Sequence, residues 1–285
     1  MHSLAYDAND DSGMSMDFLV RRIAVESSVS VGSLELFTEL VPKSLSFIQG
    51  FVPSIKSFFD SSDQLYVESD RAKVVTKIDR VTLEALGDVS VFIPEGFSGE
   101  LLLYLLLLVA QGNELYKNSV SALQDYNREL SVFLSHADAR KSQKSLVDQY
   151  KKTKAMREKY NADIAEFFKN KNSTATRASF ISVIRRLQDL KDIFKAEKTL
   201  SQLHKSVNLK IFIEETTKIT GLLNLINARI KSKEIEGVSP QVVNNLATGA
   251  YEAAKLIEYV AFFNYQVEVA LTSVKNTADK LKNII

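Results

Sequence analysis

The chain contains no cysteine and no tryptophan, and only 4 prolines and 10 glycines among its 285 residues. Without cysteine there is no disulfide framework, no thiolate nucleophile and no zinc or iron–sulfur site with cysteine ligands. Few prolines and glycines in a chain of this length favour long helices over a fold of many strands and tight turns. The sequence therefore excludes sites that depend on cysteine and favours a mainly helical fold.

The common motifs of catalysis and cofactor binding are also missing. The three histidines, His2, His136 and His204, stand in no metal-binding spacing such as HExxH, and neither GxxxxGK[ST] nor GxGxxG is present. Ser135, His136 and Asp138 are residue types of a catalytic triad, but such close neighbours fit the end of a helix and its cap better. We therefore predict a non-enzymatic protein with no catalytic residues, no cofactor and no metal.

One long apolar run, Leu101 to Ala110, raises the question of a membrane span. As a helix these ten residues would rise about 15 Å, whereas a bilayer span needs about 20 residues. Because Glu100 and Glu114 flank the run, we predict no membrane span and instead a helix covered by neighbours on all sides. The N-terminus, MHSLAYDANDDSGMSMD, lacks the basic and then apolar order of a signal peptide, so no secretion by that route is predicted.

Apolar residues recur every three or four positions along most of the chain from Ser98 onward, the pattern of amphipathic helices. Ser98 and Thr176 are the expected caps of two of these helices. The predicted helices cover residues 98–135, 138–171, 177–204 and 207–231, and a last one runs from Pro240 through Leu281. The sequence therefore predicts an all-α fold over residues 98–285, a bundle of long antiparallel helices with coiled-coil-like packing.

The first third of the chain has a less regular pattern. Residues 1–15 are acidic and have no apolar period, which predicts a disordered tail. Residues 16–97 are expected to form short helices, one of them with Pro42 in its first turn. The runs VVTKIDRV and DVSVFIP, with a Gly-Asp pair between them, favour a small β-hairpin around residues 74–93. A helix is the alternative for the first run.

The last predicted helix has the most regular pattern, with Ser239 as its expected cap and Pro240 as its first residue. Positions alternately four and three apart form a seam in which only Asn264 is polar: Leu246, Ala250, Ala253, Ile257, Val260, Asn264, Val267, Leu271, Val274, Ala278 and Leu281. Asn264 either fixes the register and the partner of this helix or marks a place where the helix rotates out of the core.

The seam also predicts a contact with another chain, because no other predicted helix is long enough to cover it. Leaving several large apolar side chains in water would forfeit several kcal/mol, at about 1.5–3 kcal/mol for each. The C-terminal half of the helix is therefore expected to pack against another copy or a neighbouring protein. The expected interface residues are Asn264, Val267, Leu271, Val274 and Leu281.

Charge is unevenly distributed along the chain, although the formal net charge is only +1. Residues 1–135 hold 10 Lys and Arg against 19 Asp and Glu, a net charge of −9, and residues 136–285 hold 26 against 16, a net charge of +10. Such asymmetry indicates nucleic-acid contact or attraction between the two halves, within one chain or between neighbours. The densest basic cluster is the candidate nucleic-acid-binding site, with a solvated helix surface as its alternative: Lys151, Lys152, Lys154, Arg157 and Lys159.

The stretch MDFLVRRIAVESSVSVGSLELFTELVPKSLSFIQGFVPSIKSFF, with the helical remainder of a chain rich in Lys, Asn and Ser, resembles the uncharacterised virion structural proteins of large tailed bacteriophages. The resemblance implies a protein in the capsid or tail that binds other virion proteins or DNA. We therefore predict a structural or assembly protein of the virion or cytoplasm, which binds other copies of itself or other structural proteins through helical surfaces. A nucleic-acid-associated protein and a membrane-active helical protein are the alternatives.

Overall fold

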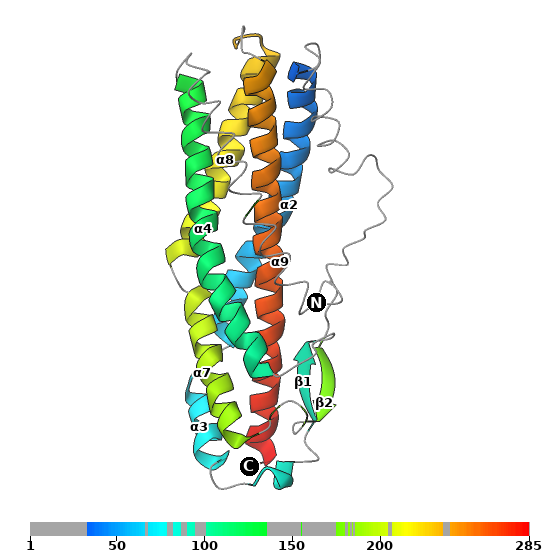
Figure 1. The fold of residues 1–285 in the computed structure, drawn as a ribbon, viewed down its shortest axis with the longest axis vertical. Helices are drawn as coiled ribbons and strands as arrows, with labels where there is room; N and C mark the ends of the chain where they lie inside the picture. The colour runs from blue at the N-terminus through cyan, green and yellow to red at the C-terminus, as the bar shows by residue number, and fades with distance from the viewer. Residues whose placement is uncertain are drawn as a thin grey trace. The chain divides into compact units, whose positions relative to one another are not determined.

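The computed structural model describes residues 33–65, 68–78, 82–86, 90–94, 101–135, 175–179, 186–204, 207–235 and 240–284, with Ala155, Ser182 and Ile184. Over these ranges the chain is an all-α bundle with a small two-stranded ribbon (Figure 1). The helices are α2 (Ser33–Leu65), α3 (Glu68–Ile78), α4 (Leu101–Ser135), α7 (Leu187–His204), α8 (Val207–Lys231) and α9 (Pro240–Ile284). The tail at residues 1–15, the caps Ser98 and Ser239 and, apart from Ala155, the helix predicted over 138–171 lie outside the described residues.

Contacts divide the chain into two compact units, each assembled from three stretches that are distant in the sequence. Unit 1 comprises Met1–Gly50, Ser119–Ala155 and Glu214–Glu258, and unit 2 comprises Phe51–Asn118, Met156–Ile213 and Tyr259–Ile285. The helices α2, α4, α8 and α9 contribute residues to both units. The sequence-based division between residues 97 and 98 separates consecutive parts of the chain. The two units instead combine segments from the beginning, middle and end of the chain.

Unit 1 is held together by contacts that α4 and α9 make with the other helices. The hydroxyl of Tyr126 on α4 donates a hydrogen bond of 2.9 Å to the carbonyl oxygen of Leu246 on α9. The ammonium of Lys255 on α9 lies 5.3 Å from the centre of the Phe47 ring on α2, which is the distance of a cation–π contact. Together with a contact between α4 and α8, these interactions join four helices around one core.

In unit 2, α4 approaches α9 closely at a glycine. A Cβ atom at Gly112 would lie 3.2 Å from the Phe263 ring and 3.5 Å from a methyl group of Leu203, so α4, α9 and α7 meet here. The ring of Phe263 packs edge-on against Tyr116, with ring centres 5.7 Å apart at 81°. The hydroxyl of Tyr116 in turn donates a hydrogen bond to Oδ1 of Asn264. A polar pair is thus enclosed in the core beside the Phe263 ring.

The seam on α9 lies in the chain's own core. All eleven seam positions are buried, and Asn264 is 1% exposed, so α9 does not rotate out of the core at this residue. The prediction that the C-terminal half of α9 needs another chain to cover it is wrong. Its reasoning required one partner helix as long as α9, whereas several shorter segments, among them α4 and α7, share the cover. The expected interface residues, each at most 1% exposed, are Asn264, Val267, Leu271, Val274 and Leu281.

The sequence located several helix ends correctly. The predicted end of α4 at Ser135, the end of α7 at His204 and the start of α9 at Pro240 are confirmed, as are both ends of α8, Val207–Lys231. Two starting points were wrong. Thr176 does not cap a helix but lies in strand β2 (Ala175–Ser179), and the described part of α7 begins at Leu187.

Pro42 lies inside α2 and not in its first turn, since α2 begins at Ser33. A proline in a helix interior removes one backbone hydrogen bond and costs about 3 kcal/mol. Apolar side chains on both sides of it are fully buried in the same core, including Phe37, Leu40 and Ile48. Their burial, at about 1.5–3 kcal/mol each, outweighs the loss and keeps the helix continuous.

The predicted hairpin at 74–93 is replaced by a different pairing. The first run is helical as far as Ile78, where Val74 and Ile78, four residues apart, are both buried on one face of α3. The second run contains strand β1 (Ser90–Pro94), which pairs antiparallel with β2, Pro94 opposite Ala175 (Figure 1). The strand partner is thus distant in the chain, a pairing that a hairpin prediction does not consider.

The apolar run at the start of α4 is only partly covered. Leu101, Tyr104, Leu105 and Leu108 are buried, but Leu103 is 55% exposed and Leu106 is 49% exposed. The prediction that neighbours cover this run on all sides is therefore wrong for the part of the chain that the structure describes. Among the helices in that part, none combines the length and apolar character that a membrane crossing requires.

Glycine-to-alanine substitutions are expected to distinguish a helical glycine packed against a neighbouring side chain from one that faces open space. At Gly249 a Cβ atom would lie 2.6 Å from Cε2 of Tyr126, whose hydroxyl is anchored to α9, so Gly249→Ala should destabilise the fold by about 1–3 kcal/mol. At Gly50 nothing lies within 4 Å, so Gly50→Ala should stabilise it by about 0.5–1 kcal/mol. Urea unfolding measures both, and equal effects of the two changes would contradict this packing.

Candidate functional site

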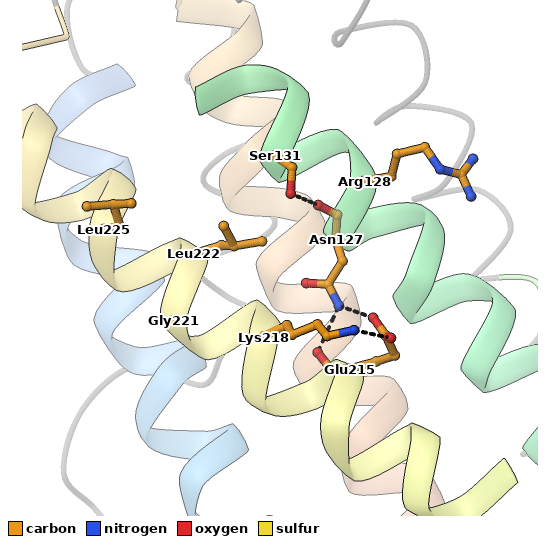
Figure 2. A pocket seen from close by; sticks show the side chains of 8 residues that line it. All are labelled: Asn127, Arg128, Ser131, Glu215, Lys218, Gly221, Leu222 and Leu225. Atoms are coloured by element: carbon orange, nitrogen blue, oxygen red, sulfur yellow. Dashed lines mark hydrogen bonds and ion pairs between the residues drawn. The ribbon is translucent and has the colours of Figure 1, made fainter. Parts of the chain in front are cut away.

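A recess opens between α4 and α8 in unit 1 (Figure 2). It has a volume of about 530 Å³ and combines buried polar groups with one exposed and one half-buried leucine side chain. Its lining residues are Asn127, Arg128 and Ser131 of α4, and Glu215, Lys218, Gly221, Leu222 and Leu225 of α8. Three of these eight residues are charged and two are leucines, so the recess offers both polar and apolar contacts to a binding partner.

The polar side of the recess is built on the carboxylate of Glu215, which is only 7% exposed. Nδ2 of Asn127 donates hydrogen bonds to Oε2 of Glu215 at 2.7 Å and to its backbone oxygen at 2.9 Å. Nζ of Lys218 donates to Oε1 at 2.7 Å. This hydrogen bond, together with the negative charge of Glu215, raises the pKa of the exposed Lys218. The buried carboxylate is thereby satisfied, and Lys218 stays charged at the rim.

One buried acceptor at the recess has no partner within the described chain. Oδ1 of Asn127 accepts no hydrogen bond, although Asn127 is only 6% exposed. In Figure 2 the amide nitrogen of Asn127 is directed at Glu215, and its oxygen lies on the other side of the amide group. A buried polar atom without a partner costs about 1–3 kcal/mol. An incoming N–H or O–H group that displaced the side chains covering this atom would remove that cost, which makes the recess a candidate binding site.

The apolar side of the recess lies along one side of α8. Leu225 is 43% exposed, Leu222 is half-buried, and nothing lies within 4 Å of the position that a Cβ atom would take at Gly221. At the opposite rim the guanidinium of Arg128 is 68% exposed and forms an ion pair of 3.1 Å with Asp125. An apolar centre with a charged rim is the usual composition of a protein–protein contact.

A second polar cluster, in unit 2, has the character of a structural clamp. The guanidinium of Arg71 on α3 forms two hydrogen bonds with the carboxylate of Glu197 on α7, at 2.9 and 2.6 Å, and Glu197 is fully buried. Burial raises the pKa of Glu197, against the opposing effect of Arg71. Within the described ranges, no group of three or more His, Asp or Glu side chains could hold a metal ion.

The sequence did not predict the recess. The basic cluster at 151–159 lies outside the described residues, and the predicted interface on α9 is internal. A signal was nevertheless present on α8, where apolar residues at helical spacing are all buried: Phe212, Ile219, Leu223, Ile226 and Ile230. Leu222 and Leu225 fall outside that set, and apolar residues that lie beside the inward face of a helix indicate a second contact surface.

Comparison with known proteins identifies no relative. No protein-family model, no curated protein and no solved structure matches the chain. The resemblance to virion proteins therefore rests on the sequence alone and stays a prediction.

Proposed function

We propose that this protein is a non-enzymatic structural or assembly protein that binds other copies of itself through the recess between α4 and α8. The observation that carries the proposal is the combination of an exposed leucine, Leu225, with a buried acceptor without a partner, Oδ1 of Asn127. A helix of a second copy would cover the leucine and could donate a hydrogen bond to the amide oxygen. Each of these changes lowers the free energy of the complex.

Charge supports a second copy as the occupant. The rim of the recess carries the exposed cations Arg128 and Lys218, which are paired with Asp125 and Glu215 of their own helices. Residues 1–135 of every copy have a net charge of −9, so a second copy supplies acidic groups that could meet this rim. Complementary charges at a rim speed the encounter and select the partner more than they strengthen the contact.

The resemblance of the chain to virion structural proteins of large tailed bacteriophages supports the same proposal. In such a setting the contact would join this protein to its own copies, or to other structural proteins of a capsid or tail. The long helices suit that role, because they present extended surfaces on a packed core.

Filling the recess tests the proposal. Gly221→Leu places a side chain where nothing lies within 4 Å, so the fold should tolerate it while the entering helix is blocked. Gly50→Leu is the matched control, because Gly50 is also helical, exposed and open at its Cβ position. Light scattering coupled to size exclusion should find self-association lost in Gly221→Leu and retained in Gly50→Leu. Retained association in both variants would rule out the recess as the contact.

The charge of the second half favours one alternative, a nucleic-acid-associated protein. Residues 136–285 have a net charge of +10, with the densest basic cluster at 151–159. Binding through this cluster would weaken steeply as salt rises, because each neutralised phosphate releases counterions. A native protein that binds no DNA at low salt would exclude the alternative.

A further inference from the structure

The exposed side of α8 in unit 1 carries charge only near its two ends. Five residues that alternate four and three positions apart are all exposed, and we call them the α8 stripe: Glu214, Lys218, Gly221, Leu225 and Ala228. Lys218, Gly221 and Leu225 follow one another along the recess in Figure 2. The ten residues from Ile219 to Ala228 carry no charge. Spacing of this kind is the one at which two helices pack side by side.

The charges at the two ends of the α8 stripe decide how a second α8 could lie on it. Glu214 begins the stripe, and Arg229, whose side chain is 42% exposed, follows its last residue. The ion pair of Arg229 with Glu234 of the same chain is long, at 4.0 Å. Two parallel α8 helices would bring like charges together at both ends. In an antiparallel pair, Glu214 of each copy meets Arg229 of the other, so both ends have opposite charges.

The same antiparallel register fits the middle of the α8 stripe. When the two ends are paired in this way, Gly221 lies opposite Leu222 of the other copy, and Lys218 lies opposite Leu225. Nothing lies within 4 Å of the position that a Cβ atom would take at Gly221, so there is room for a leucine side chain. The methylene groups of Lys218 can cover Leu225 while its ammonium stays bonded to Glu215.

We propose that a second copy enters the recess with its own α8, antiparallel to the first and related to it by a two-fold axis beside Gly221. This arrangement rests on the proposed self-association and specifies which segment of the second copy enters. A two-fold axis makes the two halves of the contact equivalent, so the pair is closed. The recess that receives the helix is lined by Asn127, whose buried amide oxygen has no partner within the described chain.

Exchanging the charges at the two ends tests this pairing in full-length chains. Glu214→Arg places a cation opposite Arg229 of the other copy, and Arg229→Glu places an anion opposite Glu214, so each variant alone has like charges at both ends. Each should raise the dissociation constant for self-association about tenfold at low salt. An equal mixture of the two variants has opposite charges at both ends and should associate as the natural protein does. Glu84→Arg, the same change at an exposed residue of unit 2, should leave association unchanged.

Cysteine cross-linking tests which positions face each other, because the natural chain contains no cysteine. Chains with Lys218→Cys are mixed with chains with Leu225→Cys and oxidised. A disulfide requires Cα atoms within about 7 Å, so the mixture should form cross-linked dimers and neither variant alone should do so. Cross-linking of each variant with itself would indicate a parallel pair and would overturn the proposal.

Failure of the α8 pairing and failure of the proposed function give different results. If Gly221→Leu abolishes association, but the charge variants associate like the natural protein and the cysteine mixture forms no dimer, another segment enters the recess and only the α8 pairing is wrong. If the natural protein does not associate at any concentration, both are wrong. Weakened association of both charge variants that mixing fails to restore would also contradict the antiparallel pair.

Discussion

Replacing Glu197 with alanine is expected to lower the free energy of unfolding by about 3–5 kcal/mol. The carboxylate of Glu197 is fully buried and bonds the guanidinium of Arg71 through both of its oxygens. Removing it deprives a buried cation of its carboxylate, and the cation cannot regain water without local unfolding. Because this pair joins α3 to α7, the loss should appear in urea unfolding as a lower midpoint.

The control for Glu197 is an exposed ion pair of unit 2. Lys275 and Asp279 lie 3.1 Å apart on α9 and are 38% and 47% exposed. Lys275→Ala should change stability by less than about 1 kcal/mol, because water screens such pairs. If Glu197→Ala cost no more than this control, the buried clamp would be dispensable.

Leu271→Ala is expected to lower the free energy of unfolding by about 2–5 kcal/mol without changing the mass of the protein in solution. Leu271 is fully buried within the single chain, so its truncation leaves a cavity in the core and touches no contact between copies. Tyr265→Ala, on the same helix but 40% exposed, should cost much less. A multimer that dissociated on Leu271→Ala with little loss of stability would restore the intermolecular role first predicted for this seam.

The long regular helices could be predicted from the sequence because local pattern and packing agree in them. Pro240 starts α9 as its residue type favours, and the seam that follows is buried throughout. Prediction failed where the contacts of distant segments decided the result. Pro42 stays within a helix because the core on both sides holds it there, and Ala175–Ser179 forms a strand only because β1 pairs with it. The residues next to Pro42 and those within 175–179 do not by themselves predict either result.

The candidate site was harder to predict, for a related reason. Most large apolar residues of α8 are buried, among them Ile219, Leu223 and Ile226, whereas Leu225 is exposed. Asn127 carries no sequence signal, because its importance depends on Glu215, which lies 88 positions away on another helix. The polar part of the recess therefore becomes visible only when α4 and α8 are placed together in unit 1.

The most direct test of the central claim is the mass of the natural protein in sedimentation equilibrium over a wide range of concentrations. Association through the recess predicts an average mass that rises above the 31.9 kDa of one chain as concentration increases. It also predicts that Gly221→Leu remains at the single-chain mass over the same range. A natural protein that stays at 31.9 kDa at every concentration would contradict assembly with its own copies.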